Sequence, residues 1–387
     1  MRWSDERQID VSIVIPTLNE GANLPALMHR IDDTMGGQSY EVVIVDDGSK
    51  DDTLNVCAVL SGKYPLQLFV RTEPENGLSG AVLYGLARTH GRFLVVMDAD
   101  LQHPPEQIPD LLAPLERGDA EFVIGSRYVA GGSTDGKWGA LRRLNSWVAT
   151  FLARPFAGHT RDPMSGFFAL RREIYQRAGR LNPIGYKIAL ELMCKCRVKN
   201  ACEVPIHFGV REAGESKLSV KQQVRYLDHL SRLYDFSFPK ASPLAKFVIA
   251  TGCAWLIAFG LYVRLVAQNV SPVRAPTLAF IAAVLMTAAF HLRSLRNYGK
   301  RSLSRRDWSD FSMLIIGEWS ICTLAAHWVG THIEHLTVSQ FFVVTFGTAA
   351  IARYTLRAGL FHNLQGVRES STEKPVSSDA AKRRNAA

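Results

Sequence analysis

The sequence predicts a doubly wound α/β domain followed by an all-α transmembrane domain. Over residues 1–240, short β-branched runs alternate with segments of helical periodicity, which is the pattern of a largely parallel sheet covered by helices. Residues 244–356 are instead dominated by long apolar runs with few charges, and a run of about 20 apolar residues is long enough to cross a bilayer. The chain therefore has a soluble half and a membrane half.

Five short apolar runs are expected to form the strands, because they are rich in β-branched residues and end at turn signals. They cover residues 11–15, 42–45, 66–70, 93–97 and 122–124. We expect Asn19 to cap the first helix, since asparagine is a favoured N-cap residue. The apolar stripe of that helix consists of Leu24, Leu27, Met28 and Ile31. A further helix is expected over residues 80–89.

Polar clusters follow three of these strands, at residues 17–20, 46–49 and 98–102. In doubly wound sheets, ligands bind in the crevice beyond the carboxyl ends of the strands. We therefore expect the three clusters to meet in one binding site.

The segment Asp98-Ala99-Asp100-Leu101-Gln102 is the sharpest chemical signal in the chain. Two carboxylates at this spacing can reach one divalent cation together, and Gln102 could add a neutral oxygen. Mg²⁺ and Mn²⁺ prefer oxygen ligands and accept a diphosphate in the rest of their coordination shell. Such a pair is weak evidence in an ordinary loop, but here it follows an apolar strand and precedes a Gln-His-Pro-Pro turn.

Other polar residues could bind a nucleotide or a phosphate. A carboxylate at Asp46 or Asp47 could accept hydrogen bonds from a base or from ribose hydroxyls, and residues 16–20 could form the opposite wall of the pocket. Guanidinium and ammonium groups bind phosphate, and five of them lie in polar stretches after the metal motif: Arg127, Arg142, Arg143, Arg211 and Lys217. Each alone is more often a solvated charge, but together they indicate a phosphate site.

Composition excludes several classes of protein. The formal net charge is +9, but the basic residues cluster beside apolar runs, which indicates a membrane surface rather than a nucleic acid. No nucleic-acid-reading motif is present. The six cysteines include no CxxC pair, so we expect reduced thiols and no zinc site.

The membrane half predicts a topology. The N-terminal ten residues lack the apolar core of a signal peptide, so the domain over residues 1–218 is expected in the cytosol. Four spans are expected at residues 244–266, 275–292, 311–330 and 337–356, within a transmembrane domain over residues 244–360. The loop between the second and third spans is rich in arginine and lysine, which places it and both termini on the cytoplasmic side. Residues 367–387 are polar and are expected to be disordered.

Residues 219–240 connect the two halves with an amphipathic pattern. Its apolar stripe consists of Val220, Val224, Leu227, Leu230 and Tyr234, and its basic residues lie off that stripe. The pattern predicts a helix at the membrane surface. Packing of the same stripe against the soluble domain is an alternative that the sequence leaves open.

The order of motifs resembles a known family. Family 2 glycosyltransferases of the GT-A fold are matched at residues 16–20 (PTLNE), 45–49 (VDDGS), 76–81 (NGLSGA) and 97–105 (MDADLQHPP). Dolichol-phosphate mannosyltransferases with a C-terminal four-helix membrane domain are matched more narrowly at residues 125–128 (GSRY), 162–168 (DPMSGFF), 182–187 (NPIGYK) and 214–217 (GESK). The resemblance covers about residues 10–240 and implies a Rossmann-like GT-A sheet.

The resemblance also implies roles for individual residues. The metal, Mg²⁺ or Mn²⁺, would be held by Asp98, Asp100 and Gln102, and Arg127 would join them in catalysis. The nucleotide-sugar would be bound by Pro16, Leu18, Glu20, Val45, Asp47, Asp98, Ala99, Asp100, Lys187, Arg211 and Lys217. The acceptor phosphate would be bound by Arg127, Arg142 and Ser146. The family often has tyrosine where this chain has Leu18, so an aromatic wall beside the base would be absent.

The implied function is metal-dependent, inverting transfer of a hexose to a polyprenyl phosphate, dolichyl or undecaprenyl, with mannose from GDP-mannose as the expected sugar. Transfer from a UDP-sugar such as UDP-glucose to undecaprenyl phosphate uses the same motifs and stays open. A protein that binds or translocates lipid-linked sugars without transferring them is an alternative of another class, against which the intact Asp98 and Asp100 argue. A processive synthase is disfavoured, because no true QxxRW motif is present.

Overall fold

The structure is a computed structural model. It describes residues 9–270 except 73–74, 135–139, 180, 210–219 and 240, and beyond residue 270 it describes scattered helical positions between 274 and 340. The chain divides into two compact units, Met1–Pro239 and Lys240–Ala387. Each unit is considered by itself.

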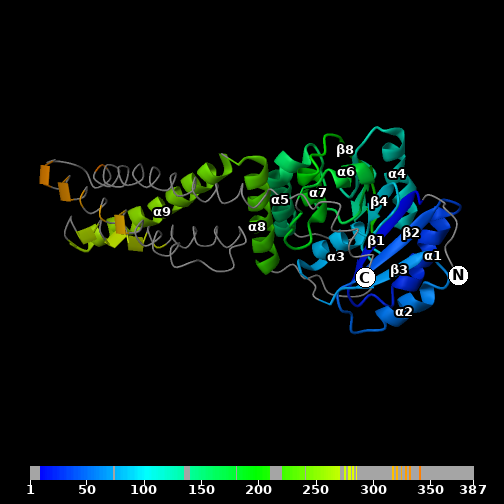
Figure 1. The fold of residues 1–387 in the computed structure, drawn as a ribbon. Coiled ribbons are helices and arrows are strands. Elements are labelled where there is room, and N and C mark those ends of the chain that lie inside the picture. Colours follow the sequence, from blue (N-terminus) through cyan, green and yellow to red (C-terminus); the bar gives the residue numbers. More distant parts are fainter. Residues whose placement is uncertain are drawn as a thin grey trace, which may run out of the picture. The chain divides into compact units, whose positions relative to one another are not determined.

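Within the described part of the first unit, seven strands form one sheet in the order β3-β2-β1-β4-β7-β5-β8 (Figure 1). Their bounds are β1 Val11–Thr17, β2 Tyr40–Asp46, β3 Leu66–Val70, β4 Phe93–Val96, β5 Phe122–Ser126, β7 Phe168–Arg171 and β8 Ala201–Pro205. Neighbouring strands are parallel except at β7, which runs antiparallel to both β4 and β5. The short strands β6 Ser133–Thr134 and β9 His207–Phe208 pair with each other. The predicted, largely parallel α/β sheet is confirmed.

Helices cover both faces of this sheet. Their bounds are α1 Leu24–Met35, α2 Thr53–Leu60, α3 Gly77–Leu86, η1 Pro105–Gln107, α4 Ile108–Arg117, α5 Ala140–Ala157, α6 Arg172–Gln176, α7 Ile188–Lys195 and α8 Val220–Ser237. Helices α1, α2 and α4 contribute to the core on one face. Helices α3, α5, α6, α7 and α8 contribute to the core on the other face. The site therefore rests on a three-layer α/β/α unit.

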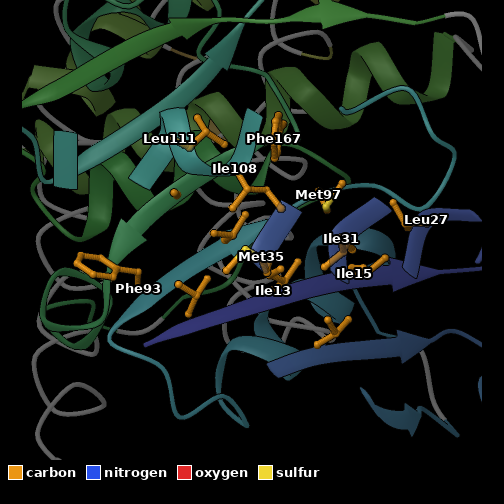
Figure 2. Packing of buried hydrophobic residues seen from close by; sticks show 14 of the residues in the cluster. Ile13, Ile15, Leu27, Ile31, Met35, Phe93, Met97, Ile108, Leu111 and Phe167 are labelled. Carbon is orange, nitrogen blue, oxygen red and sulfur yellow. The ribbon is translucent and has the colours of Figure 1, made fainter. Parts of the chain in front are cut away.

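The side chains of β1 show why the strands are largely apolar. Ile13 and Ile15 belong to the same core cluster as α1, and in Figure 2 Ile13 appears beside Met35 and Ile15 beside Ile31. Val14 points to the opposite core cluster, because successive side chains of a strand alternate between faces. A strand covered on both faces by helices is largely apolar, which explains the apolar runs in the sequence. The buried Ser12 is an exception, and its hydroxyl donates to Glu41 of β2 at 2.6 Å.

The expected strands are found within two residues of their predicted ends, and β3 has the predicted bounds. The helix expected over 80–89 is α3, which begins and ends three residues earlier. The prediction that Asn19 caps α1 is wrong. Asn19 has a left-handed φ of 60°, and the helix begins at Leu24, after Asn23. The apolar stripe predicted for this helix is buried as expected.

Helix α8 packs on the first unit and also presents apolar side chains to solvent. Leu230 and Leu233 are buried in the core cluster shared with α7, and the hydroxyl of Tyr226 donates to the carbonyl of Ala149 in α5 at 2.8 Å. Leu227, which belongs to the predicted stripe, is 53% exposed. One part of the stripe thus packs on the soluble unit, and contact of the other part with a membrane remains a prediction.

The second unit is described mainly through helix α9, Ala241–Ala267. Among the described residues, its segment Val248–Ala267 is the one helix long and apolar enough to cross a membrane. It overlaps the first predicted span, 244–266. The other three predicted spans fall largely outside the described residues, and the predicted tail, 367–387, falls wholly outside them.

Candidate active site

The loops after β1 and β2 are joined into one wall. Asp46 is fully buried, and its Oδ1 accepts the backbone N–H groups of Gly48 and Ser49 at 2.9 Å each. The backbone N–H of Asn19 donates to the Ser49 hydroxyl at 2.7 Å, and the side-chain oxygen of Asn19 accepts the N–H of Lys50 at 2.8 Å. Asp46 therefore organises the turn, which leaves Asp47 as the carboxylate placed at the strand end.

Asp47 is held by an arginine that sequence reasoning missed. Arg71 Nε lies 2.6 Å from Asp47 Oδ1, and its Nη2 lies 2.7 Å from Oδ2, in a bidentate pair. Arg71 also donates to the carbonyls of Glu75 and Gly77 at 3.0 Å. Its position directly after β3 was the available signal, since β3 is the fourth strand whose carboxyl end carries a polar group. The pair orients Asp47 and ties the wall to the start of α3.

The metal motif forms a tight loop after β4. The backbone N–H of Asp98 donates to Nδ1 of His103 at 3.0 Å, and Asp100 Oδ1 accepts the N–H of Gln102 at 3.2 Å. Between them, Leu101 has a left-handed φ of 61°, which lets the chain reverse direction. The side-chain amide nitrogen of Gln102 donates to the carbonyl of Gly209 at 3.0 Å, so the motif is fastened to the chain just before residues 210–219.

His103 supports this loop from the core. It is 2% exposed and stacks on Phe167 with ring centroids 5.3 Å apart. Burial lowers the pKa of His103, so the ring is neutral, and because Nδ1 accepts the N–H of Asp98 the proton resides on Nε2. Sequence reasoning assigned His103 no role, although it noted the Gln-His-Pro-Pro turn.

The donor set fits a divalent cation that shares its shell with a substrate. The Asp98 side chain is 33% exposed, whereas Asp100 is buried, so one carboxylate faces outward from the loop. Among the described residues, no group of three or more His, Cys, Asp or Glu side chains is arranged to hold an ion. Two carboxylates and an amide oxygen are suitable ligands for Mg²⁺ or Mn²⁺, provided that a diphosphate supplies further oxygens.

Arg127 is fixed at the end of β5. Its Nε lies 2.7 Å from Asp162 Oδ2 and its Nη2 lies 2.8 Å from Oδ1. Asp162 in turn accepts the backbone N–H of Arg127 at 3.2 Å, and its own N–H donates to Glu203 at 2.8 Å. The side chains are 15% and 1% exposed. Asp162 thus positions Arg127 by binding one edge of its guanidinium. Sequence reasoning placed Asp162 in a motif but gave it no role.

The segment before β7 brings Asp162 beside the metal motif. Gly166 lies so close to that loop that a Cβ there would be 3.1 Å from Asp98 Oδ2 and 3.2 Å from His103 Cε1. Contacts of this length leave little room for any side chain. The glycine therefore allows the 162–167 segment and the 98–103 loop to pack together.

Lys187 completes the described cluster of charges. Its Nζ donates to the carbonyl of Met164 at 3.1 Å and lies 4.3 Å from the ring centroid of Tyr186. Burial and the neighbouring Arg127 guanidinium lower the pKa of Lys187 to about 8, although Asp162 and Asp98 act in the opposite direction. The group is thus a cation at neutral pH that is poorly neutralised by its surroundings, which suits it to bind an anion.

The remaining predicted site residues differ in their exposure and in whether the structure describes their side chains. The side chains of Pro16, Val45 and Ala99 are buried, so their contacts with a ligand would come from the backbone. Leu18 is 52% exposed and Glu20 is partly buried. The structure places Arg142, Arg143 and Ser146 in α5 without describing their side chains, and Arg211 and Lys217 lie outside the described residues.

Dolichol-phosphate mannosyltransferases are among the sequence relatives of this chain. Dolichol-phosphate mannosyltransferases are 46% identical over 226 residues in Pyrococcus furiosus, 41% over 246 in Mycosarcoma maydis and 40% over 241 in Saccharomyces cerevisiae. The matches cover 58%, 61% and 59% of this chain, and 63%, 83% and 89% of the respective relatives. The chain thus spans less than two thirds of the archaeal relative but most of the two fungal ones.

A family model and a solved structure were also matched. Residues 12–179 match the model of glycosyl transferase family 2. Glucosyl-3-phosphoglycerate synthase from Mycobacterium tuberculosis, in complex with Mn²⁺, UDP-glucose and phosphoglyceric acid, gives a TM-score of 0.46 at 24% identity, over 59% of this chain and 79% of that one. From its sequence relatives, the chain is a glycosyltransferase of family 2 and belongs to the family of dolichol-phosphate mannosyltransferases.

Proposed function

We propose that this enzyme transfers mannose from GDP-mannose to a polyprenyl phosphate, dolichyl or undecaprenyl, and inverts the configuration at the anomeric carbon. The observation that carries the proposal is the placement of Lys187 and the Arg127–Asp162 pair beside Asp98 at the ends of β4 and β5. Such a site can receive two anionic partners, a nucleoside diphosphate sugar and a phosphate lipid. Identity of 40–46% with named dolichol-phosphate mannosyltransferases supports mannose as the sugar.

We assign the metal to Asp98, Asp100 and Gln102, with Mg²⁺ or Mn²⁺ as the ion. When bound, such an ion neutralises negative charge that builds up on the departing nucleoside diphosphate. The contribution of the chain is to hold the carboxylates in place through His103 and through the turn at Leu101.

The donor is assigned to the wall formed by the β1 and β2 loops. Asp47, oriented by Arg71, would accept hydrogen bonds from the nucleoside, and Leu18 and Glu20 would face it from the β1 loop. Lys187 would bind the diphosphate, together with Arg211 and Lys217. The bidentate pair gives Asp47 one orientation before the donor arrives, which lowers the entropic cost of binding.

The acceptor phosphate is assigned to Arg127, Arg142 and Ser146. A phosphate oxygen would form a bond to the anomeric carbon while the bond from that carbon to the diphosphate oxygen breaks, and the electron pair would leave with GDP. A phosphate monoester is mostly ionised at pH 7, because its second pKa is near ~6. The nucleophile therefore needs no general base, and positioning and charge stabilisation by the chain supply the catalysis.

We also propose that the enzyme works at the cytoplasmic face of a membrane as a multi-pass protein. Exposed apolar side chains on α5 and α8 support this proposal: Trp147 is 62% exposed, Phe151 54% and Leu227 53%. The apolar segment Val248–Ala267 supports a membrane anchor. Orientation rests on the basic loop over residues 293–306 and the positive-inside rule.

The proposed function is tested with membranes that contain the full chain, polyprenyl phosphate and radiolabelled donor. We expect lipid-extractable label from GDP-mannose in the presence of Mg²⁺ or Mn²⁺, and loss of that label after chelation by EDTA with recovery on adding the ion back. Label from UDP-glucose alone would reject mannose as the sugar. Full activity in EDTA would reject the metal assignment.

The lowered pKa of Lys187 predicts an alkaline decline in activity. Below pH 8 the ammonium is charged and can bind the diphosphate, and as the pH rises through about 8 the charge is lost. We therefore expect kcat/KM for GDP-mannose, which reports the free enzyme, to fall above pH 8. Lys187→Arg should remove that limb, because the guanidinium stays charged throughout the range.

The matched control for this pH profile is Lys199→Arg, at an exposed position away from the site. It should reproduce the wild-type profile. An alkaline limb that persists unchanged in Lys187→Arg would show that another group titrates there.

A further inference from the structure

A buried carboxylate links α7, α8 and the loop that carries Lys187. Glu191 in α7 is 1% exposed. Its Oε1 lies 2.9 Å from the backbone nitrogen of Asn182 and 2.7 Å from Lys195 Nζ, and its Oε2 lies 2.8 Å from His229 Nε2. Lys195 Nζ also donates to the side-chain oxygen of Asn182 at 2.5 Å. Three groups thus converge on one carboxylate, one from the loop before α7, one from α7 itself and one from α8.

The network keeps Glu191 charged. Burial by itself would raise the pKa of Glu191, but the hydrogen bond from His229 and the charge of Lys195 outweigh burial and lower it. His229 is fully buried, and its Nδ1 finds no hydrogen-bond partner within the part of the chain that the structure describes. Buried ionic groups of this kind add little to stability compared with apolar side chains of the same volume. A contribution to stability therefore explains the presence of the network poorly. The contacts that the network makes with neighbouring segments explain it better.

The geometry fixes the loop over residues 182–187. At its start, Asn182 is bound through both its backbone N–H and its side chain. In its middle, Gly185 has a φ of 83°, and its carbonyl accepts the N–H of Ser79 in α3 at 3.2 Å. At its end, Lys187 reaches the carbonyl of Met164. The Glu191 network attaches this loop to α8, because His229 belongs to α8.

We propose that Glu191, His229 and Lys195 form a positioning network, which holds the 182–187 loop so that Lys187 points at the donor diphosphate. The network also makes the position of Lys187 depend on how α8 packs against α7. The inference rests on the proposed role of Lys187 in donor binding. His229 is a positioning residue here, since it acts through Glu191 and touches no substrate.

Two substitutions of His229 separate the contact from the volume of the ring. In glutamine, the amide nitrogen can take the place of Nε2, so His229→Gln keeps a donor to Glu191. In asparagine, the shorter side chain brings its amide only to the place of Nδ1, so His229→Asn loses that donor. We expect His229→Asn to weaken binding of GDP-mannose about tenfold, the lower end of the cost of losing an orienting partner, and His229→Gln to restore most of it.

The measurements use the full chain in lipid nanodiscs with Mg²⁺. Equilibrium binding of GDP-mannose gives Kd, and steady-state transfer gives KM and kcat. In His229→Asn, KM for the donor should rise with Kd while kcat changes less than about twofold, and the alkaline limb of kcat/KM should move to higher pH as Lys187 becomes less buried. A merely structural defect would reduce the active fraction and lower kcat, leaving KM and the pH limb in place.

Asn182→Ala is a second variant, which tests the network independently if His229→Asn fails to fold. Asn182 is exposed, and the substitution removes the bond to Lys195 but keeps the backbone bond to Glu191, so a threefold increase in Kd is expected, roughly half of the free-energy effect of His229→Asn. Unchanged Kd and pH limb in both His229→Asn and Asn182→Ala would overturn the network.

The same data separate this inference from the proposed function. Wild-type mannosyl transfer with equal donor affinity in all variants overturns the network alone. A second outcome is that donor affinity differs between the asparagine and glutamine variants while the wild-type enzyme transfers no mannose to polyprenyl phosphate. This outcome supports the network and overturns the proposed function alone. Absence of any GDP-mannose binding by the wild type overturns both.

Discussion

Replacing Asp100 with asparagine is expected to lower the transfer rate about a thousandfold, which corresponds to several kcal/mol of lost charge stabilisation. The side chain of Asp100 is buried, and its Oδ1 accepts the N–H of Gln102. The amide oxygen of asparagine can accept the same bond, so the loop should keep its shape. What is lost is the negative charge that we propose holds the metal.

The measurement is initial-rate mannosyl transfer at saturating Mn²⁺, together with the thermal unfolding midpoint. Asp110→Asn is the matched control, since Asp110 is an exposed carboxylate in the first turn of α4 and its loss should leave the rate unchanged. An Asp100→Asn enzyme with wild-type rate would remove Asp100 from the metal site. A rate loss accompanied by unfolding would instead assign Asp100 to the fold.

Replacing Asp162 with asparagine is expected to lower the free energy of unfolding by about 3 kcal/mol, because breaking a buried ion pair leaves its partner without compensation. Arg127 would then keep its positive charge at a largely buried position. Activity should also fall, since the Arg127 guanidinium, which we propose binds the acceptor, would lose the bidentate contact that orients it. Chemical denaturation of the full chain, followed by fluorescence, measures the first effect, and transfer at limiting polyprenyl phosphate measures the second.

The control for Asp162 is a second arginine–aspartate pair, which lies on the surface. Arg117 Nε lies 2.6 Å from Asp119 Oδ2, and both side chains are 61% exposed, so Asp119→Asn should cost less than about 1 kcal/mol. The double variant Arg127→Met, Asp162→Asn should regain part of the lost stability but no activity, because it removes the uncompensated charge while the asparagine oxygen can still accept the backbone N–H of Arg127. A double variant less stable than Asp162→Asn would show that the pair is not the source of the cost.

The fold was predictable for those strands and helices whose formation depends mainly on their own residues. The runs that form β1 to β5 are rich in apolar and β-branched residues, so their composition alone marks them as strands. Asn19 was misjudged because its left-handed conformation is set by contacts with Ser49 and Lys50 on the neighbouring loop. Strand β7 was missed because it follows the glycine-containing segment 162–167 and runs against its neighbours.

The placement of candidate site residues at strand ends, such as Asp98 and Asp100 after β4, was predictable from the sequence. Residues that orient those groups were missed, because their partners are distant in sequence. Arg71 lies 24 residues from Asp47, and Asp162 lies 35 residues from Arg127. An ion pair of this separation depends on which strands become neighbours, and a single sequence carries no direct record of that pairing.

The reversed direction of β7 determines which edge of the sheet the preceding segment, residues 162–167, reaches. Its first residue, Phe168, pairs with Val96 and Ile124, so the chain arrives at the ligand-binding edge through residues 162–167 instead of departing from it. A parallel strand would deliver that segment to the opposite edge of the sheet. The segment therefore contacts the 98–103 loop through Gly166, Arg127 through Asp162 and Lys187 through Met164. A change in its length would alter these three contacts together, whereas the βα units beside β1 and β2 lie outside it.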